Sequence, residues 1–196
     1  MAYDFSRLKV MVVDDNQYMR SVFREFLRSI SLKPDNIRDV IGGEEAMGVI
    51  AAFGPDLVIT DYLMEPMNGL ELTRRIRGHP DSPDPYVPII MCTGYTETKY
   101  VEAARDAGVH EVLAKPITAT TLYSRIRSII ENPRQFVKLD TFHGPDRRRR
   151  VEDVKQDRRK HTPPPAREAD AESASEDEAD APEADDENAA GEKDAS

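Results

Sequence analysis

Apolar residues in the first 130 positions of the chain follow two different spacings. Short apolar runs, rich in β-branched side chains, alternate with longer segments in which apolar residues recur every three or four positions. In the first of these longer segments the apolar side chains would form one stripe on a helix; they are Met19, Val22, Phe23, Phe26, Leu27 and Ile30. The pattern predicts that strands and amphipathic helices alternate along this part of the chain.

Five strands and five helices follow from this pattern. Strands are expected at residues 8–13, 37–41, 57–60, 87–92 and 109–113, and helices at residues 16–30, 44–53, 69–77, 97–107 and 118–131. Glycine and proline mark helix ends, as Gly54-Pro55 and Gly108 do. The strands are apolar almost throughout, which is typical of strands covered on both faces. We therefore expect an α/β fold with a doubly wound, five-stranded parallel sheet and right-handed crossovers.

The charge of the chain is distributed unevenly. Residues 1–130 carry a net charge of −3, residues 131–167 carry +5 and residues 168–196 carry −12, which together give the −10 of the whole chain. The chain thus consists of a nearly neutral body, a basic segment and an acidic end.

The composition after the last expected helix indicates how the chain is organised. An RRRR run at 147–150 and a triple proline precede a final stretch made mostly of Ala, Asp, Glu and Ser. Such a stretch cannot bury enough apolar surface to offset the entropy lost on ordering. We expect a folded domain at 1–132, a basic Pro/Arg-rich connector at 133–167 and a disordered acidic tail at 168–196.

Several classes of protein are excluded by the sequence. Cys92 is the only cysteine, so neither an intramolecular disulfide nor a cysteine-rich zinc site can form. No apolar run reaches the roughly 20 residues that a membrane-spanning helix needs. The first ten residues lack the basic and then apolar pattern of a secretory signal. We expect a protein of a reducing compartment, the cytoplasm.

Polar side chains follow four of the expected strands where the chain leaves the sheet. They are Asp14 and Asp15 after the first strand, Asp61 after the third, Thr93 after the fourth and Lys115 after the fifth. Ligands of open parallel sheets bind beyond the carboxyl ends of the strands, so these side chains would converge on one rim if the first, third, fourth and fifth strands are neighbours. Three adjacent carboxylates repel one another, and Mg²⁺ relieves that repulsion while it also binds phosphate oxygens. The constellation indicates Mg²⁺-assisted phosphoryl transfer to a carboxylate.

Five short motifs at these positions resemble the receiver domain of two-component response regulators, the chemotaxis-regulator-like family. They are VVDD at 12–15, ITD at 59–61, MEPMNG at 64–69, IIMCTG at 89–94 and LAKPI at 113–117. Each motif alone has little specificity, but five in order at the ends of expected strands are specific. The resemblance covers residues 7–131 and implies the flavodoxin-like strand order 2-1-3-4-5 with five helices.

The resemblance implies a metal site at the rim. Mg²⁺ would be bound directly by Asp15 and Asp61, through water by Asp14, and by the backbone carbonyl of Leu63. Asp14 and Asp15 also suit the start of a helix as capping residues, and capping is compatible with metal binding.

The same resemblance implies the residues that act on phosphate. Asp61 would be the phosphoacceptor, Lys115 would contact the acceptor and phosphoryl oxygens, and Thr93 would be the switch hydroxyl. Pro116 would hold the loop after Lys115, where the family often has a cis bond. An aromatic switch residue is frequent three positions before the lysine, and here that position is Val112.

Two further departures concern the path of an attacking water. Leu63 and Tyr95 stand two residues after Asp61 and Thr93, where the chemotaxis archetype has polar residues. We expect these bulky, non-acidic side chains to slow self-dephosphorylation.

The resemblance predicts a stand-alone receiver that acts as a phosphoacceptor switch rather than as an enzyme. A sensor histidine kinase or a histidine phosphotransfer protein would donate the phosphoryl group. The output would be altered contact with a downstream protein through roughly residues 97–131, by a monomer or a phosphorylation-dependent dimer. A phosphohydrolase with an aspartate nucleophile is the less favoured alternative, because no insertion is long enough to form a substrate cap.

The basic connector leaves a second alternative open. Its arginines could bind nucleic acid or an anionic surface, with the receiver tuning that binding, or they could form a solvated linker. No DNA-reading module follows, so nucleic acid is not the expected partner. The apolar residues Phe136, Val137, Leu139 and Phe142 would pack on the receiver or form a short partner-binding motif. The four histidines, at positions 79, 110, 143 and 161, are expected on the surface.

Overall fold

The computed structural model describes residues 4–80, 82–139 and 142–146. The chain divides into two units, Met1–Val151 and Glu152–Ser196, and every described residue belongs to the first unit. The acidic tail expected at 168–196 and the basic runs of the connector lie outside the described residues.

The order of strands and helices agrees with the pattern read from the sequence. The strands of the main sheet are β1 (Val10–Val13), β2 (Ile37–Val40), β3 (Leu57–Asp61), β4 (Ile89–Thr93) and β5 (Glu111–Ala114). The helices are α1 (Gln17–Ser29), α2 (Gly43–Phe53), α3 (Gly69–Gly78), α4 (Thr98–Asp106) and α5 (Ala119–Glu131), with a short 3₁₀ turn η1 (Pro34–Asn36) before β2. None of the helices within the described ranges is long and apolar enough to cross a lipid bilayer.

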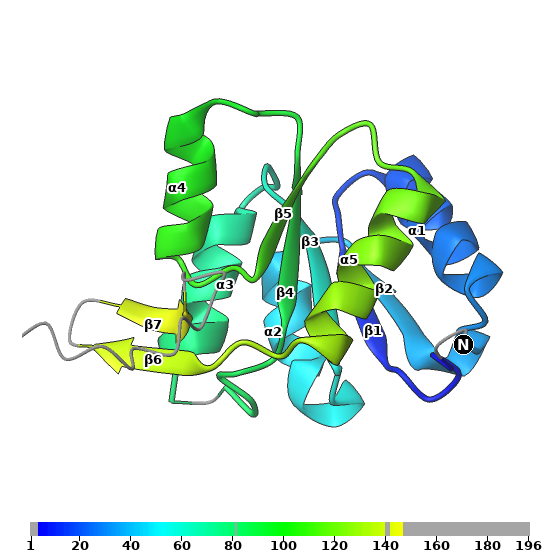
Figure 1. Cartoon of the computed structure of the whole chain (residues 1–196), viewed down its shortest axis with the longest axis horizontal. Coiled ribbons are helices and arrows are strands. Elements are labelled where there is room, and N and C mark those ends of the chain that lie inside the picture. Colours follow the sequence, from blue (N-terminus) through cyan, green and yellow to red (C-terminus); the bar gives the residue numbers. More distant parts are fainter. Residues whose placement is uncertain (1–3, 81, 140–141, 147–196) are drawn as a thin grey trace, which may run out of the picture. The chain divides into compact units, whose positions relative to one another are not determined.

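The sheet is parallel, with the strand order β2-β1-β3-β4-β5 (Figure 1). This order confirms the expected flavodoxin-like, doubly wound fold. In the register, Val13 lies beside Thr60 and Asp61 lies beside Cys92. The residues that follow β1, β3, β4 and β5 therefore meet at one rim of the sheet, as the argument from topology requires.

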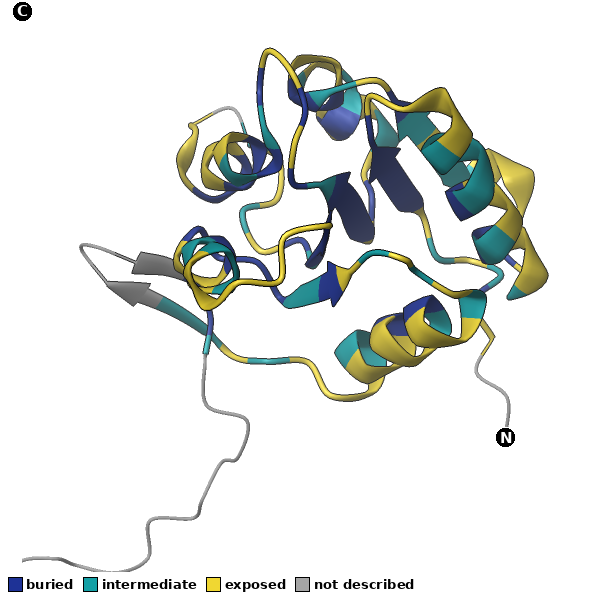
Figure 2. Cartoon of the chain, turned by 90° about the horizontal axis from the view of Figure 1, so that it is seen from above, coloured by how far each residue is buried: buried dark blue, intermediate teal, exposed yellow. Residues whose placement is uncertain are grey.

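Two apolar layers cover the sheet. Side chains of α2, α3 and α4 pack on one face, and those of α1 and α5 pack on the other. Successive residues of β1 alternate between these layers, since Met11 and Val13 join the first and Val10 and Val12 the second. All four are fully buried, and Figure 2 shows the buried strands enclosed by helices whose outer faces are exposed. This double burial explains why the strands are nearly continuous apolar runs.

A β hairpin follows the last helix. Its strands are β6 (Phe136–Leu139) and β7 (Phe142–Pro145), which pair antiparallel, and β7 contacts α3 and α4. Gly144 and Pro145 are buried, and the amide of Asp146 donates to the carbonyl of Gln135 at 2.7 Å. The sequence pattern had placed no strand in this segment.

The first strand of the hairpin contacts the body through the aromatic ring of Phe136. Phe136 meets the ring of Tyr86 edge to face, with centroids 5.1 Å apart, and its centroid lies 5.1 Å from the guanidinium carbon of Arg77 and 5.3 Å from the ring of His110. Of the two alternatives for this apolar segment, packing on the receiver therefore holds for Phe136.

Candidate functional site

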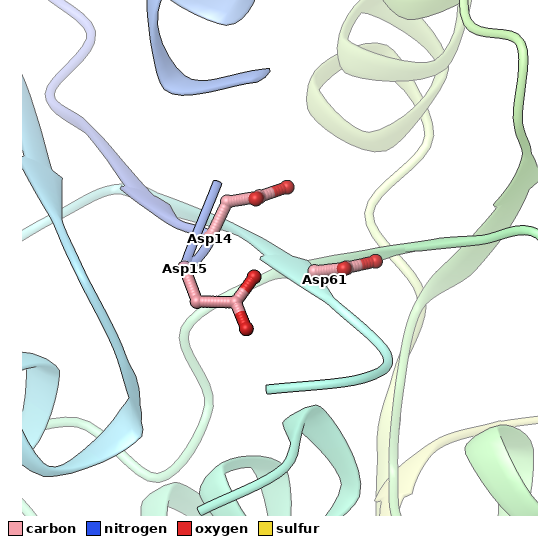
Figure 3. Close-up of side chains that lie close together, drawn as sticks. All are labelled: Asp14, Asp15 and Asp61. Atoms are coloured by element: carbon pink, nitrogen blue, oxygen red, sulfur yellow. The ribbon is translucent and has the colours of Figure 1, made fainter. Parts of the chain in front are cut away.

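Three carboxylates gather at the rim of the sheet. Asp14 and Asp15 directly follow β1, and Asp61 is the last residue of the neighbouring strand β3. One oxygen of each lies within 4.8 Å of the others, and Figure 3 shows the three side chains together. Asp14 is buried, Asp61 is partly buried and Asp15 is exposed. The adjacency of β1 and β3, which are distant in sequence, produces the acidic cluster.

Lys115 completes the cluster from the end of β5. Its Nζ lies 2.8 Å from Oδ1 of Asp61 and 3.6 Å from Oδ2 of Asp14. Its backbone amide donates to the carbonyl of Thr93 at 2.8 Å, and the Lys115–Pro116 peptide is cis, as the family resemblance implied. The lysine is therefore fixed to β4 by its backbone while its ammonium reaches the carboxylates.

The local environment shifts two of these groups. Burial, with the nearby charges of Asp61 and Asp15, raises the pKa of Asp14 above its ordinary value, although the Asn16 amide and Lys115 oppose the shift. Burial also opposes the charge on Lys115. The hydrogen bond to Asp61 and the charges of Asp61 and Asp14 outweigh it, so that the pKa of Lys115 is raised. The site holds a charged lysine among carboxylates whose mutual repulsion it relieves only in part.

The residues present fit a hard divalent cation. Oδ1 of Asp14 accepts from the amide of Asn16 at 2.9 Å, whereas its buried Oδ2 accepts no hydrogen bond within the described residues. The cap of α1 is Asn16, whose side chain accepts from the amides of Tyr18 and Met19, so Asp14 and Asp15 are not used as the cap. A buried oxygen without a hydrogen bond beside two more carboxylates is the donor set that Mg²⁺ prefers.

The two oxygens of Asp61 have different surroundings. Oδ1 accepts from Nζ of Lys115 at 2.8 Å and from the amide of Tyr62, also at 2.8 Å. No described residue donates a hydrogen bond to Oδ2. The two oxygens therefore differ, because Oδ1 has two donors and Oδ2 has none among the described residues.

Thr93 lies at the same rim, but its hydroxyl is used locally. Oγ1 of Thr93 accepts from the amide of Tyr95 at 2.9 Å and lies 3.5 Å from the carbonyl of the same residue. Leu63 follows Asp61 by two residues, and its side chain is 51 % exposed. The structure thus brings Asp14, Asp15, Asp61 and Lys115 into contact, while Thr93 and Leu63 border them.

Gly69 is a positioning residue that the sequence argument did not single out. It begins α3, and a Cβ at this position would lie 2.1 Å from the carbonyl oxygen of Asp61. Its amide donates to the carbonyl of Tyr62, and the cap of α3 is the reciprocal pair of Asn68 and Glu71. The NG pair of the MEPMNG motif was the available signal, because only glycine permits so close an approach to the strand that carries Asp61.

A second polar group lies at the opposite end of the sheet and was also missed. Arg77 is buried and donates from Nε and one terminal nitrogen to the carbonyl of Gly108, and from the other to the carbonyl of Pro85. His110 is 8 % exposed, so its expected place on the surface is wrong. Its Nδ1 accepts from the amide of Ile89, and burial followed by the charges of Arg77 and Arg134 lowers the pKa of His110 to about 3. Its burial results from the hairpin, which no local pattern indicated.

The comparison with protein families agrees with this geometry. The model of the response regulator receiver domain matches residues 10–127, and the chain belongs to this family. Receiver domains are signalling switches of two-component systems.

Relatives and solved structures support the same assignment. The chain is 30 % identical over 124 residues to the chemotaxis protein CheY-3 of Vibrio cholerae, which covers 63 % of this chain and 92 % of that protein. It is 31 % identical over 123 residues to the response regulator MprA of Mycobacterium tuberculosis. The match covers 63 % of this chain and 50 % of that protein. A crystal structure of a putative response regulator from Chloroflexus aurantiacus superposes with a TM-score of 0.58 at 29 % identity, covering 64 % of this chain and 98 % of that one.

Proposed function

We propose that the protein is a single-domain response regulator that accepts a phosphoryl group on Asp61. The observation that carries this proposal is the 2.8 Å contact between Lys115 and Oδ1 of Asp61, beside Asp14 and Asp15. Two acids follow one strand, a third ends the neighbouring strand and a lysine follows a third strand. This arrangement is difficult to explain as structural, because one buried carboxylate oxygen has no hydrogen bond from the part of the chain that the structure describes.

The acidic cluster would hold Mg²⁺. Asp15 and Asp61 would bind it directly, Asp14 through water, and the backbone carbonyl of Leu63 would complete the set. When bound, the ion supplies positive charge that neutralises the phosphoryl oxygens and the carboxylates.

The protein's own groups would guide the transfer. Oδ2 of Asp61 attacks phosphorus, the new oxygen–phosphorus bond forms, and the phosphorus–nitrogen bond to the donor histidine breaks, with its electron pair returning to the imidazole. Oδ1 stays bonded to Lys115 and the Tyr62 amide, which orients the carboxylate. Lys115 then offsets the negative charge that arrives, and the Thr93 hydroxyl donates to a phosphoryl oxygen.

The phosphodonor would be a sensor histidine kinase or a histidine phosphotransfer protein in the cytoplasm. The output would be altered binding of a downstream protein to the surface of α4, β5 and α5, by a monomer or a phosphorylation-dependent dimer. A groove of about 700 Å³ supports this assignment, since it runs from Thr93 and Tyr95 past Val112 to Arg134 and Pro145. The groove joins the rim of the site to the face that would contact the partner.

The proposal is tested by Mg²⁺-dependent phosphorylation with acetyl phosphate, followed by intact mass measurement. We expect one phosphoryl group on the wild type, none without Mg²⁺ and none on Asp61→Asn. Asp35→Asn is the matched control, because Asp35 is an exposed acid in η1, which precedes β2 at the opposite end of the strands from the rim. Phosphorylation of Asp61→Asn equal to that of the wild type, or no modification of any variant, would contradict the proposal.

A further inference from the structure

Three tyrosine rings pack together, and one of them belongs to Tyr62, the residue after Asp61. The ring centroids of Tyr95 and Tyr100 lie 4.9 Å apart, those of Tyr62 and Tyr100 lie 5.6 Å apart in an edge-to-face arrangement, and those of Tyr62 and Tyr95 lie 6.2 Å apart. All three distances are within the range of attractive aromatic pairs. The three rings therefore form one cluster, which we call the tyrosine cluster.

Each ring comes from a different part of the site. Tyr62 directly follows Asp61 and donates its amide to that carboxylate. Tyr95 lies two residues after Thr93, and Tyr100 lies in the first turn of α4. Tyr62 is 9 % exposed and Tyr95 is 41 % exposed, so the cluster extends from the interior to the surface. Through side chains in direct contact, the tyrosine cluster connects the end of β3, the loop after β4 and the helix α4.

The Thr93 hydroxyl is hydrogen-bonded to one residue of the tyrosine cluster. Its oxygen accepts from the Tyr95 amide at 2.9 Å, which holds the loop between β4 and α4 in a tight turn. A Thr93 hydroxyl that donates to a phosphoryl group on Asp61 gives up its own 3.5 Å donor contact with the Tyr95 carbonyl. Where the side chain also rotates towards Asp61, the oxygen moves away from the Tyr95 amide, and Tyr95 takes a new arrangement against Tyr62 and Tyr100.

We propose that Tyr95 is the positioning residue that couples the Thr93 hydroxyl to α4, with the rings of Tyr62 and Tyr100 as its contacts; this inference rests on the proposed phosphorylation of Asp61. The side chain at the usual position of an aromatic switch residue, Val112, agrees with a route through Tyr95. Val112 of β5 is a half-buried valine that packs against the same apolar layer as Tyr62 and has no ring or hydroxyl to offer. The coupling therefore runs through the loop before α4 and not through β5.

The consequence is a surface that depends on the state of Asp61. α4 lines the groove that reaches from Thr93 to Pro145, through Val101, Glu102 and Arg105. A shift of Tyr95 that moves the first turn of α4 changes the width of this groove. Packed side chains have discrete arrangements, so a change at one hydroxyl is transmitted as a change between two packings.

The test measures amide hydrogen exchange of α4 with and without beryllofluoride and Mg²⁺, a stable mimic of the phosphorylated state. For the wild type we expect a change in exchange rate of roughly tenfold, an ordinary size for coupling between two sites. Tyr95→Ala should bind beryllofluoride as the wild type does, yet show little change in α4. Tyr95→Phe keeps the ring and should restore the response.

Two further variants separate this role from a merely structural one. Thr93→Val should also remove the response of α4, and the double variant Thr93→Val/Tyr95→Ala should show no additional loss, because both residues act on one route. Tyr18→Ala is the control, since this ring is 74 % exposed on α1 and should leave the response intact.

The outcomes are distinguishable. A full response of α4 in Tyr95→Ala, or losses that add in the double variant, would overturn the coupling through Tyr95 and leave the phosphoacceptor role of Asp61 standing. Failure of the wild type to bind beryllofluoride and to accept a phosphoryl group would overturn both proposals. A response lost in Tyr95→Ala, restored in Tyr95→Phe and unchanged in Tyr18→Ala would support the coupling.

Discussion

The ammonium of Lys115 lies 3.6 Å from the buried Oδ2 of Asp14, an oxygen that accepts no hydrogen bond within the described residues. The lysine is closer to Asp61, at 2.8 Å, so Asp14 receives only part of its charge. The native state thus keeps a carboxylate that is buried, weakly paired and close to two other acids. Such a group is costly for stability and useful for binding a cation.

Replacing this carboxylate should stabilise the protein. We expect Asp14→Asn to raise the free energy of unfolding at neutral pH by about 1 kcal/mol, a common gain when a strained functional site is relieved. Thermal unfolding without metal measures the effect. The same variant should bind Mg²⁺ more weakly, which Mg²⁺ titration followed by the shift of the melting temperature would show.

The pH dependence of this gain follows from the raised pKa of Asp14. A carboxyl whose pKa is higher in the folded state favours folding when it is protonated, and that contribution is lost as the pH rises from the unfolded to the folded value. The advantage of Asp14→Asn should therefore be full at neutral pH and disappear below about pH 4, the ordinary range of aspartate. An advantage that is equal at both pH values would contradict this account of Asp14.

Leu63 should control the lifetime of the phosphorylated state. Its side chain is 51 % exposed two residues after Asp61, where a polar group could orient an attacking water. We expect Leu63→Asn to shorten the lifetime of the phosphorylated protein by an order of magnitude or more, because a positioned polar group accelerates attack by water. Loss of the phosphoryl group over time, followed by intact mass, is the measurement. Leu63→Met keeps the apolar bulk and should retain the wild-type lifetime.

The hairpin should contribute to the stability of the receiver. The ring of Phe136 lies 5.1 Å from the guanidinium of Arg77, and this contact is partly desolvated. We expect Phe136→Ala to lower the free energy of unfolding by roughly 1–2 kcal/mol, the size of such a cation–π contact. Urea unfolding measures it, and Phe136→Leu, which keeps apolar area without the ring, should recover only part of the loss. An unfolding midpoint of Phe136→Ala equal to that of the wild type would show that the ring of Phe136 does not stabilise the receiver.

His110 should make the protein sensitive to acid. Its pKa is lowered to about 3, first by burial and then by the charges of Arg77 and Arg134. A histidine of depressed pKa contributes stability above the ordinary value near 6.5, and this contribution is lost as the pH falls towards 3, by at most about 1.4 kcal/mol per pH unit. His110→Asn keeps an acceptor for the Ile89 amide and should unfold less readily in this range.

The control for this prediction is an exposed histidine. His79 follows α3 on the surface, and His79→Asn is the matched substitution at an exposed position. Urea unfolding at several pH values between 7 and 3 compares the three proteins. Identical pH profiles for wild type and His110→Asn would show that His110 takes up no proton on unfolding.

Much of the molecule follows from the sequence, because local patterns carry the information. The apolar runs predicted each strand of the parallel sheet, and the 3.6-residue stripes predicted each helix that covers it, to within about two residues. Strands buried on both faces are apolar throughout, and amphipathic helices have apolar residues every three or four positions, so both are visible in the sequence. The candidate site was accessible for a related reason. Once the strands are parallel and take the order that the family resemblance implies, Asp14, Asp61 and Lys115 lie at one rim.

Other features depended on contacts between distant segments. His110 lies against the ring of Phe136 in the hairpin and close to Arg77 and Arg134. No spacing in the sequence predicts that these residues come together. The choice of Oδ1 of Asp61 for Lys115, and of the Tyr95 amide for the Thr93 hydroxyl, depends on side-chain positions that only tertiary packing fixes. The sequence by itself determined which groups stand at the carboxyl ends of the strands, because the apolar runs end there. With the strand order that the family resemblance implies, these groups meet at one rim. The tertiary structure decided which atoms they use, because hydrogen bonds depend on distances of a few ångströms.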